Sequence, residues 1–142
     1  IISSTLEASK LRKMKKVGVV SQSTQMIENV QGIMNILMEK VFDLHFVNTI
    51  CYPTKRNHEQ IKTLAMVNDV MIIIGSFTSA NSKRLAELSS ERNPNSYQVT
   101  CAEDLNVDWF KNKNSVGISA GASTPDYLID EVKLRIQEYT RK

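Results

Sequence analysis

Five consecutive apolar residues, Val70-Met71-Ile72-Ile73-Ile74, stopped by Gly75, constrain the fold of this 142-residue chain more than any other feature. A strand with one face in water alternates apolar and polar side chains, whereas this run has no polar position. It therefore predicts a parallel strand that is covered on both faces. A chain of this length can bury a core of that kind.

The rest of the chain alternates short apolar runs with segments of helical periodicity. In residues 25–41, apolar side chains recur every three or four positions and so line one face of a helix. This alternation of strands and helices predicts an α/β fold built on a parallel sheet. The expected strands are residues 17–20, 45–50, 70–74, 97–100 and 116–120, and the expected helices are residues 25–41, 55–67, 79–92 and 125–139, with a helical turn at 107–110.

Composition argues against several classes of function. The chain has 18 Lys and Arg residues against 15 Asp and Glu residues, and the basic ones are scattered, so we expect no nucleic-acid partner. No apolar run is long enough to cross a membrane, and the first ten residues lack a signal-peptide core, so we expect no membrane partner and no secretion. Two cysteines are too few for a disulfide framework, which favours a reducing compartment.

Four loops rich in small hydroxyl and amide side chains lie between an expected strand and an expected helix. In a parallel sheet such loops gather at the carboxyl ends of the strands, where helix N-termini attract anions such as phosphate. One helix terminus contributes about 0.3–1 kcal/mol and micromolar binding needs about 8 kcal/mol, so several loops would have to converge. The alternative is that these residues are ordinary helix caps. The loops are residues 21–24, 49–54, 76–82 and 120–126.

Cys51 lies inside one of these loops and leaves three interpretations open. It could be a nucleophile, a metal ligand or a small apolar residue of the core. Cys101 has no polar cluster near it in the sequence and is expected to be structural. His45 and His58 are expected at the surface or at a sheet edge rather than as catalytic bases.

The same loops carry four motifs that resemble those of the IspH (LytB) family, in the same order and over nearly the whole chain. Ala-Gly-Ala-Ser-Thr-Pro-Asp at residues 120–126 resembles the family signature, and residues 48–54 resemble its third cluster-cysteine segment. Gly75-Ser76 followed by residues 79–87 resembles its Ser-x-Asn substrate loop, and residues 19–24 resemble its Gln-Thr-Thr segment.

The resemblance implies a 4-hydroxy-3-methylbut-2-enyl diphosphate reductase of the methylerythritol phosphate route to isoprenoids. Such an enzyme removes the C4 hydroxyl as water and gives isopentenyl and dimethylallyl diphosphate. By this resemblance Cys51 would be one of three cysteine ligands of a [4Fe-4S] cluster, which leaves one iron open for substrate. Ser23 would lie beside the reacting hydroxyl, whereas the general-acid Glu of the family lies upstream of this chain. The other substrate-binding residues would be Gln22, Thr24, Thr54, Ser79, Ala80, Asn81 and Ser123.

The resemblance also implies three similar α/β domains around the cluster. This chain would supply the C-terminal half of the middle domain, residues 1–47, and the complete third domain, residues 48–142. The missing N-terminal part of the same protein would carry the other two cluster cysteines, so we expect the isolated chain to be inactive. Electrons would come from a ferredoxin or flavodoxin-type donor, in a bacterial cytoplasm or a plastid-type organelle.

Three departures from the family pattern stand in the candidate site or beside it. Ser23 replaces the usual Thr and keeps the hydroxyl, whereas Ala80 replaces a common Ser and loses one. Asn57-His58 replaces a common Arg-Gln pair on the helix that follows Cys51.

Two hypotheses from other classes remain open. A cluster-free α/β module would bind a phosphate ester through Ser79, Asn81 and Ser123 and would hold no iron. A transferase or hydrolase would use Cys51 as its nucleophile and would need a base, for which the candidates are His45 and His58.

Overall fold

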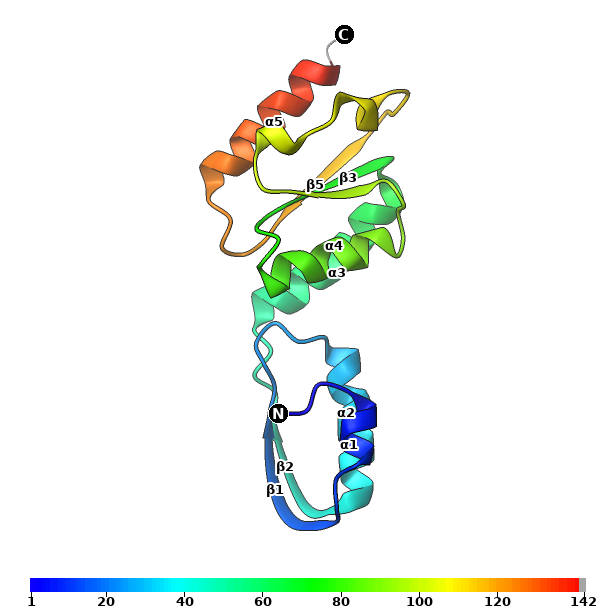
Figure 1. Cartoon of the computed structure of the whole chain (residues 1–142), viewed down its shortest axis with the longest axis vertical. Helices are drawn as coiled ribbons and strands as arrows, with labels where there is room; N and C mark the ends of the chain where they lie inside the picture. Colours follow the sequence, from blue (N-terminus) through cyan, green and yellow to red (C-terminus); the bar gives the residue numbers. More distant parts are fainter. Residues whose placement is uncertain (141–142) are drawn as a thin grey trace. The chain divides into compact units, whose positions relative to one another are not determined.

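The computed structural model describes residues 1–140, and the chain divides into two compact units, Ile1–Lys55 and Arg56–Lys142 (Figure 1). The boundary between the units falls inside one helix. The assignment of residues 1–47 and 48–142 to two domains of a larger fold stays a prediction, and residues 141–142 lie outside the described part.

The first unit is a pair of parallel strands with two helices packed on it. Val17 of β1 lies opposite Leu44 of β2 in the register, and Val20 lies opposite Val47. Both helices contribute to one small core, in which Ala8, Ile33 and Leu37 are buried. The elements are α1 (Thr5–Ser9), β1 (Met14–Val20), α2 (Ile27–Lys40) and β2 (Val41–Val47).

Strand β2 corrects one prediction from the sequence, because it begins at Val41 rather than at residue 45 and ends at Val47 rather than at residue 50. The helical periodicity of the preceding segment extends through Val41, which is buried, so spacing alone continues the helix too far. Ile50 is also buried, but it lies in the loop after the strand.

Helix α1 was not predicted, although its sequence carries a capping signal. Ser4 accepts a hydrogen bond from the N–H of Glu7, and the Glu7 carboxylate accepts one from the N–H of Ser3 at 2.7 Å. These reciprocal bonds satisfy N–H groups of the first turn and resemble a capping box.

The second unit is a three-stranded parallel sheet with helices on both faces. Strand β3 is central, and all five of its side chains are fully buried, as the apolar run predicts. Figure 1 shows α3 and α4 on one side of this sheet and α5 on the other. The elements are α3 (Tyr52–Val67), β3 (Val70–Ile74), α4 (Ala80–Ser90), β4 (Ser96–Val99), the 3-10 turns η1 (Ala102–Asp104) and η2 (Val107–Phe110), β5 (Val116–Ala120) and α5 (Asp126–Thr140).

The face of β3 toward α5 carries a hydrophobic core that is larger than the core of the first unit. Ile72 and Ile74 pack there with Val132 and Ile136 of α5 and with Phe110. Phe110 belongs to the predicted helical turn at 107–110, which is confirmed as η2. The neighbouring ring of Trp109 stacks on Tyr97 with centroids 4.0 Å apart.

The predicted fold class, a parallel-sheet α/β architecture, is confirmed, since every strand pair in the described residues is parallel. In each unit the loops singled out in the sequence therefore follow the carboxyl ends of the strands. No helix among residues 1–140 is long and apolar enough to cross a membrane.

Candidate functional site

In the first unit, the loops after β1 and β2 are joined by hydrogen bonds. The N–H of Ser21 donates to Oγ1 of Thr49 at 2.9 Å, and the Thr49 hydroxyl donates back to the Ser21 carbonyl. Two residues further along each loop, the N–H of Cys51 donates to the carbonyl of Ser23 at 3.1 Å. This bond brings together Ser23 and Cys51, which are nearly 30 residues apart in the sequence.

Cys51 stands immediately before α3, with its side chain exposed to solvent. Its Sγ lies 2.7 Å from Oγ1 of Thr54, a residue that is itself buried. Hydrogen bonds from the side chain and backbone of Thr54 lower the pKa of the Cys51 thiol below its ordinary value. A position at the N-terminus of a 16-residue helix also favours the thiolate.

These properties fit a ligand of iron better than they fit a core residue. Iron–sulfur clusters are held by thiolates, and Cys51 is exposed and disposed to lose its proton. Among residues 1–140, no group of three or more His, Cys, Asp or Glu side chains could hold a metal ion. A cluster bound at Cys51 would therefore need further ligands from outside this chain.

The two histidines considered as bases for Cys51 lie on different elements. His45 lies on β2, with its Nε2 2.8 Å from a carboxylate oxygen of Asp43. His58 was expected at the surface or at an edge, and this is wrong, because the side chain is only 5% exposed. It shares the buried face of α3 with Thr54, Ile61 and Ala65, which recur at helical spacing.

In the second unit, the loops after β3 and β5 meet at one backbone carbonyl. The carbonyl of Ile74 accepts hydrogen bonds from the N–H of Gly121 at 2.9 Å and from the hydroxyl of Thr124 at 3.0 Å. Ser123 lies in this loop and is exposed. The loop after β3 is held from β4, where the side-chain amide of Gln98 donates to the carbonyls of Gly75 and Ser76.

The first turn of α4 presents the residues predicted to hold a diphosphate. Ser79 is the N-cap, and its Oγ accepts a hydrogen bond from the N–H of Ser82 at 3.3 Å. Ala80 is exposed. Asn81 is half-buried, and its Oδ1 is buried with no hydrogen-bond partner among the described residues.

An unpartnered buried amide oxygen costs stability, because burial removes its water without replacing the hydrogen bond. Such groups are rare in native proteins and each one needs an explanation, of which an unfilled ligand site is one. The missing partner of Asn81 Oδ1 would be a hydrogen-bond donor, whereas a diphosphate oxygen would accept hydrogen bonds from the Asn81 amide N–H groups.

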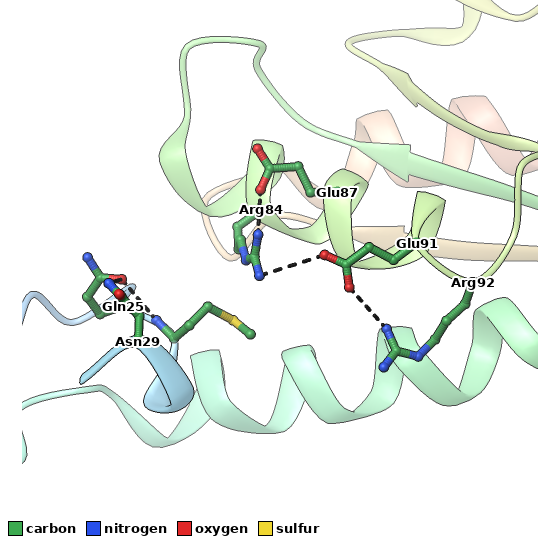
Figure 2. A network of polar contacts seen from close by, with 7 residues as sticks. Gln25, Asn29, Arg84, Glu87, Glu91 and Arg92 are labelled. Atoms are coloured by element: carbon green, nitrogen blue, oxygen red, sulfur yellow. Dashed lines mark hydrogen bonds and ion pairs between the residues drawn. The ribbon is translucent and has the colours of Figure 1, made fainter. Parts of the chain in front are cut away.

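Arg84, three residues after Asn81 on α4, is held by carboxylates. Arg84 Nη1 lies 2.7 Å from Glu87 Oε2, and Arg84 also reaches Glu91, which pairs with Arg92 (Figure 2). The chain of alternating charges neutralises Arg84 on the flank of α4. The first turn of α4 itself presents hydroxyls, the Asn81 amide and backbone N–H groups, together with the exposed side chain of Lys83.

The predicted site residues thus fall into two sets, one in each unit. The first unit holds Gln22, Ser23, Thr24, Cys51 and Thr54, and the second holds Ser79, Ala80, Asn81 and Ser123. Their assigned roles stay predictions. The sequence analysis missed Ser82, Gln98 and Thr124, which fix the backbone of the second set; the neighbouring glycines at positions 75 and 121 are the signal that could have indicated Ser82.

Comparison with known proteins identifies what the chain is similar to. The sequence model of the family described as LytB protein matches residues 1–137. The 4-hydroxy-3-methylbut-2-enyl diphosphate reductase of Geobacter sulfurreducens is 45% identical over 142 residues, which is 100% of this chain and 50% of that protein. The reductase of the same description from Aquifex aeolicus is 45% identical over 139 residues, 97% of this chain and 48% of its own length.

Two solved structures agree with the sequence comparisons. The structure of an (E)-4-hydroxy-3-methyl-but-2-enyl diphosphate reductase, described as the terminal enzyme of the non-mevalonate pathway, is 46% identical, with a TM-score of 0.66. It covers 88% of this chain, which corresponds to 44% of that protein. The E-1-hydroxy-2-methyl-but-2-enyl-4-diphosphate reductase from Plasmodium falciparum is 25% identical over 96% of this chain and 43% of its own, with a TM-score of 0.80.

The coverage is as informative as the identity. The match takes in nearly all of this chain, so both units take part in it. The chain spans only about half the length of the curated relatives that it matches.

Proposed function

This chain belongs to the LytB protein family, and on that premise we propose that it is the distal part of an iron–sulfur 4-hydroxy-3-methylbut-2-enyl diphosphate reductase. The reaction takes two electrons and two protons, breaks the C4–oxygen bond and releases the hydroxyl as water. The products are isopentenyl and dimethylallyl diphosphate. The electrons come from a ferredoxin or flavodoxin-type donor.

The observation that carries the proposal is the pairing of Cys51 with Thr54. An exposed thiol with a lowered pKa, at the head of a helix, is what an iron ligand requires. The neighbouring carbonyl of Ser23 anchors the Cys51 backbone, which limits the positions that Sγ can take. Thr54 acts on the site through this sulfur, by stabilising its thiolate.

Cys51 is proposed as one of three cysteine ligands of a [4Fe-4S] cluster. When bound, the cluster supplies the electrons and an open iron for the substrate hydroxyl. The other ligands belong to the rest of the protein, because residues 1–140 contain no group of side chains that could hold a metal ion. We therefore propose that the isolated chain does not turn over substrate.

The diphosphate is proposed to bind at the loops after β3 and β5. The Ser79 oxygen already accepts a hydrogen bond from Ser82, so its proton is left to donate to a phosphate oxygen. The Asn81 amide supplies two further N–H donors, and the Ser123 hydroxyl is exposed. The N-termini of α4 and α5 add their dipoles, and Ala80 contributes backbone but no hydroxyl.

The loop after β1 is proposed to lie beside the reacting carbon. Ser23 and Gln22 are exposed there and Thr24 is half-buried, and the link from Ser23 to Cys51 places this loop next to the proposed ligand. In this assignment residues 1–47 are half of a middle domain and residues 48–142 are a third domain. The relatives from Geobacter and Aquifex favour a bacterial cytoplasmic location.

The test replaces each cysteine in turn in the full-length protein. We expect Cys51→Ser to lose iron and nearly all activity, because a hydroxyl is a poor ligand for the cluster. Cys101→Ser is the matched control, because Cys101 follows β4 in the sequence and is not a proposed ligand. We expect the Cys101→Ser variant to keep its iron. An unchanged iron-to-protein ratio in Cys51→Ser would sink the ligand assignment. A native full-length protein without iron would favour the cluster-free phosphate-ester module instead.

A further inference from the structure

Ser82 fills a space left by two glycines. It belongs to the first turn of α4 and is only 1% exposed. A Cβ atom added to Gly75 would lie 2.3 Å from Ser82 Oγ, and one added to Gly121 would lie 2.4 Å from the same oxygen. Both distances are shorter than any real Cβ contact, so the hydroxyl occupies the volume that two side chains would otherwise need.

The two glycines open the two loops that carry the proposed diphosphate ligands. Gly75 follows β3 and begins the loop to Ser79 and Asn81, and Gly121 follows β5 and begins the loop to Ser123. Gly121 is also bonded through its N–H to the carbonyl of Ile74, the residue before Gly75. Ser82 therefore touches both loops where they are already held together.

We propose that Ser82 is a positioning residue that sets the spacing between the first turn of α4 and the Ser123 loop. The inference rests on the proposed function, because it concerns the site that holds the diphosphate. Groups that share one ligand must be fixed to within about 0.5 Å, by neighbours that are themselves locked in place. The Ser82 side chain meets this need, since its backbone is capped by Ser79 and its hydroxyl is enclosed by both loops.

The proposal predicts that a methyl group at residue 121 can take the place of the Ser82 hydroxyl. In Gly121→Ala the new methyl collides with Ser82 Oγ and pushes the loops apart. In Gly121→Ala/Ser82→Ala the hydroxyl is gone, and the nearest atom of residue 82 is its Cβ, 3.6 Å from the new methyl, which is ordinary contact. The double variant therefore restores the filled space that each single variant disturbs.

Gly75 provides a matched control. A methyl at Gly75 would lie 2.9 Å from Ser82 Cβ as well, so removal of the hydroxyl does not make room for it. Gly75 also has a φ of 157°, which L side chains rarely adopt. We expect Gly75→Ala/Ser82→Ala to remain as impaired as Gly75→Ala.

The measurement is the dissociation constant of inorganic diphosphate, by calorimetry on the full-length protein, with KM and kcat for the allylic diphosphate measured in parallel. We expect Gly121→Ala to weaken diphosphate binding by about tenfold or more. Ser82→Ala inserts no atom and is expected to weaken it by a smaller factor. The double variant is expected to lie within about threefold of the native protein, with KM following binding and the visible spectrum of the cluster unchanged in all variants.

The outcomes separate this inference from the proposed function. The positioning role would be overturned if the two substitutions had additive effects on diphosphate binding in the double variant. It would also be overturned if Ser82→Ala and Gly121→Ala left the protein folded and did not change its affinity for diphosphate. If the native protein binds inorganic diphosphate but does not reduce the allylic substrate, the proposed function fails. Rescue of diphosphate binding in the double variant would support the positioning role even then.

Discussion

Replacing Asn81 with alanine is expected to stabilise the protein while it damages the diphosphate site. The Asn81 Oδ1 is buried without a hydrogen-bond partner among the described residues. A buried acceptor left unpaired costs about 1–3 kcal/mol, and alanine removes that acceptor. Alanine is also the better helix former, by about 0.5 kcal/mol, at this second position of α4.

Truncation also loses some packing, so the net gain in unfolding free energy is expected to be about 1 kcal/mol. In the full-length protein, which by comparison with its relatives is about twice as long as this chain, such a gain raises the melting temperature by about 2 °C. The assay is thermal unfolding of the unliganded full-length protein, together with titration of inorganic diphosphate. Binding is expected to weaken by about tenfold or more, since each charge-assisted hydrogen bond contributes about 1.5–3 kcal/mol.

Ser79→Ala is the control, because it removes a neighbouring polar oxygen that does have a hydrogen-bond partner. The Ser79 hydroxyl caps α4 through the N–H of Ser82, so its loss is expected to destabilise the protein by about 1 kcal/mol. The two variants lie two residues apart and move stability in opposite directions. If Asn81→Ala destabilises as much as Ser79→Ala, the inference from the unpaired oxygen is wrong. An unchanged diphosphate affinity would contradict the assignment of the Asn81 amide N–H groups to the diphosphate.

Three further predictions concern the thiol and the two sheets. Thr54→Val removes the hydroxyl that lowers the pKa of the Cys51 thiol, so in the cluster-free protein the pH profile of alkylation is expected to move to higher pH. A profile that stays in place would contradict this. Ile72→Ala is expected to cost about 2–5 kcal/mol in chemical unfolding, because Ile72 is fully buried. Hydrogen exchange of the isolated 142-residue chain is expected to be slowest in β3 and faster in β1, and equal protection would contradict the difference between the two sheets.

The elements of the second unit could be predicted closely because their signals are local. The apolar run of β3 and the short run of β5 give the observed bounds, Val70–Ile74 and Val116–Ala120. Each run is bounded in the sequence by polar residues or by glycine, so neither needs knowledge of its partner. In β2, by contrast, the strand is defined by its register with β1, from Met14 opposite Val41 to Val20 opposite Val47. That pairing is a property of two segments, and the spacing of one segment does not contain it.

The candidate site shows the same division. The hydroxyl-rich loops could be found because helix caps and strand ends have recognisable compositions. The hydrogen bond from the Cys51 N–H to Ser23, the burial of Thr54 and the contact of Ser82 with two glycines depend on three-dimensional packing. In the sequence Ser82 cannot be told apart from the other polar residues of its helix. Only its short distances to Gly75 and Gly121 in the structure indicate a special role.

The contrast between the two sheets bears on why this chain is proposed to depend on the rest of a longer protein. In the second unit, helices cover both faces of the sheet and β3 is fully buried. In the first unit, the paired residues Val20 and Val47 are 73% and 59% exposed, and a Cβ added to Gly18 would meet nothing within 4 Å. Two parallel strands with one open face are marginal by themselves, because parallel sheets are found covered on both sides. The unit that holds Cys51 is therefore the one with the smaller core. Under the proposed function, the rest of a longer protein would supply the further cluster ligands and would also cover the open face of this sheet.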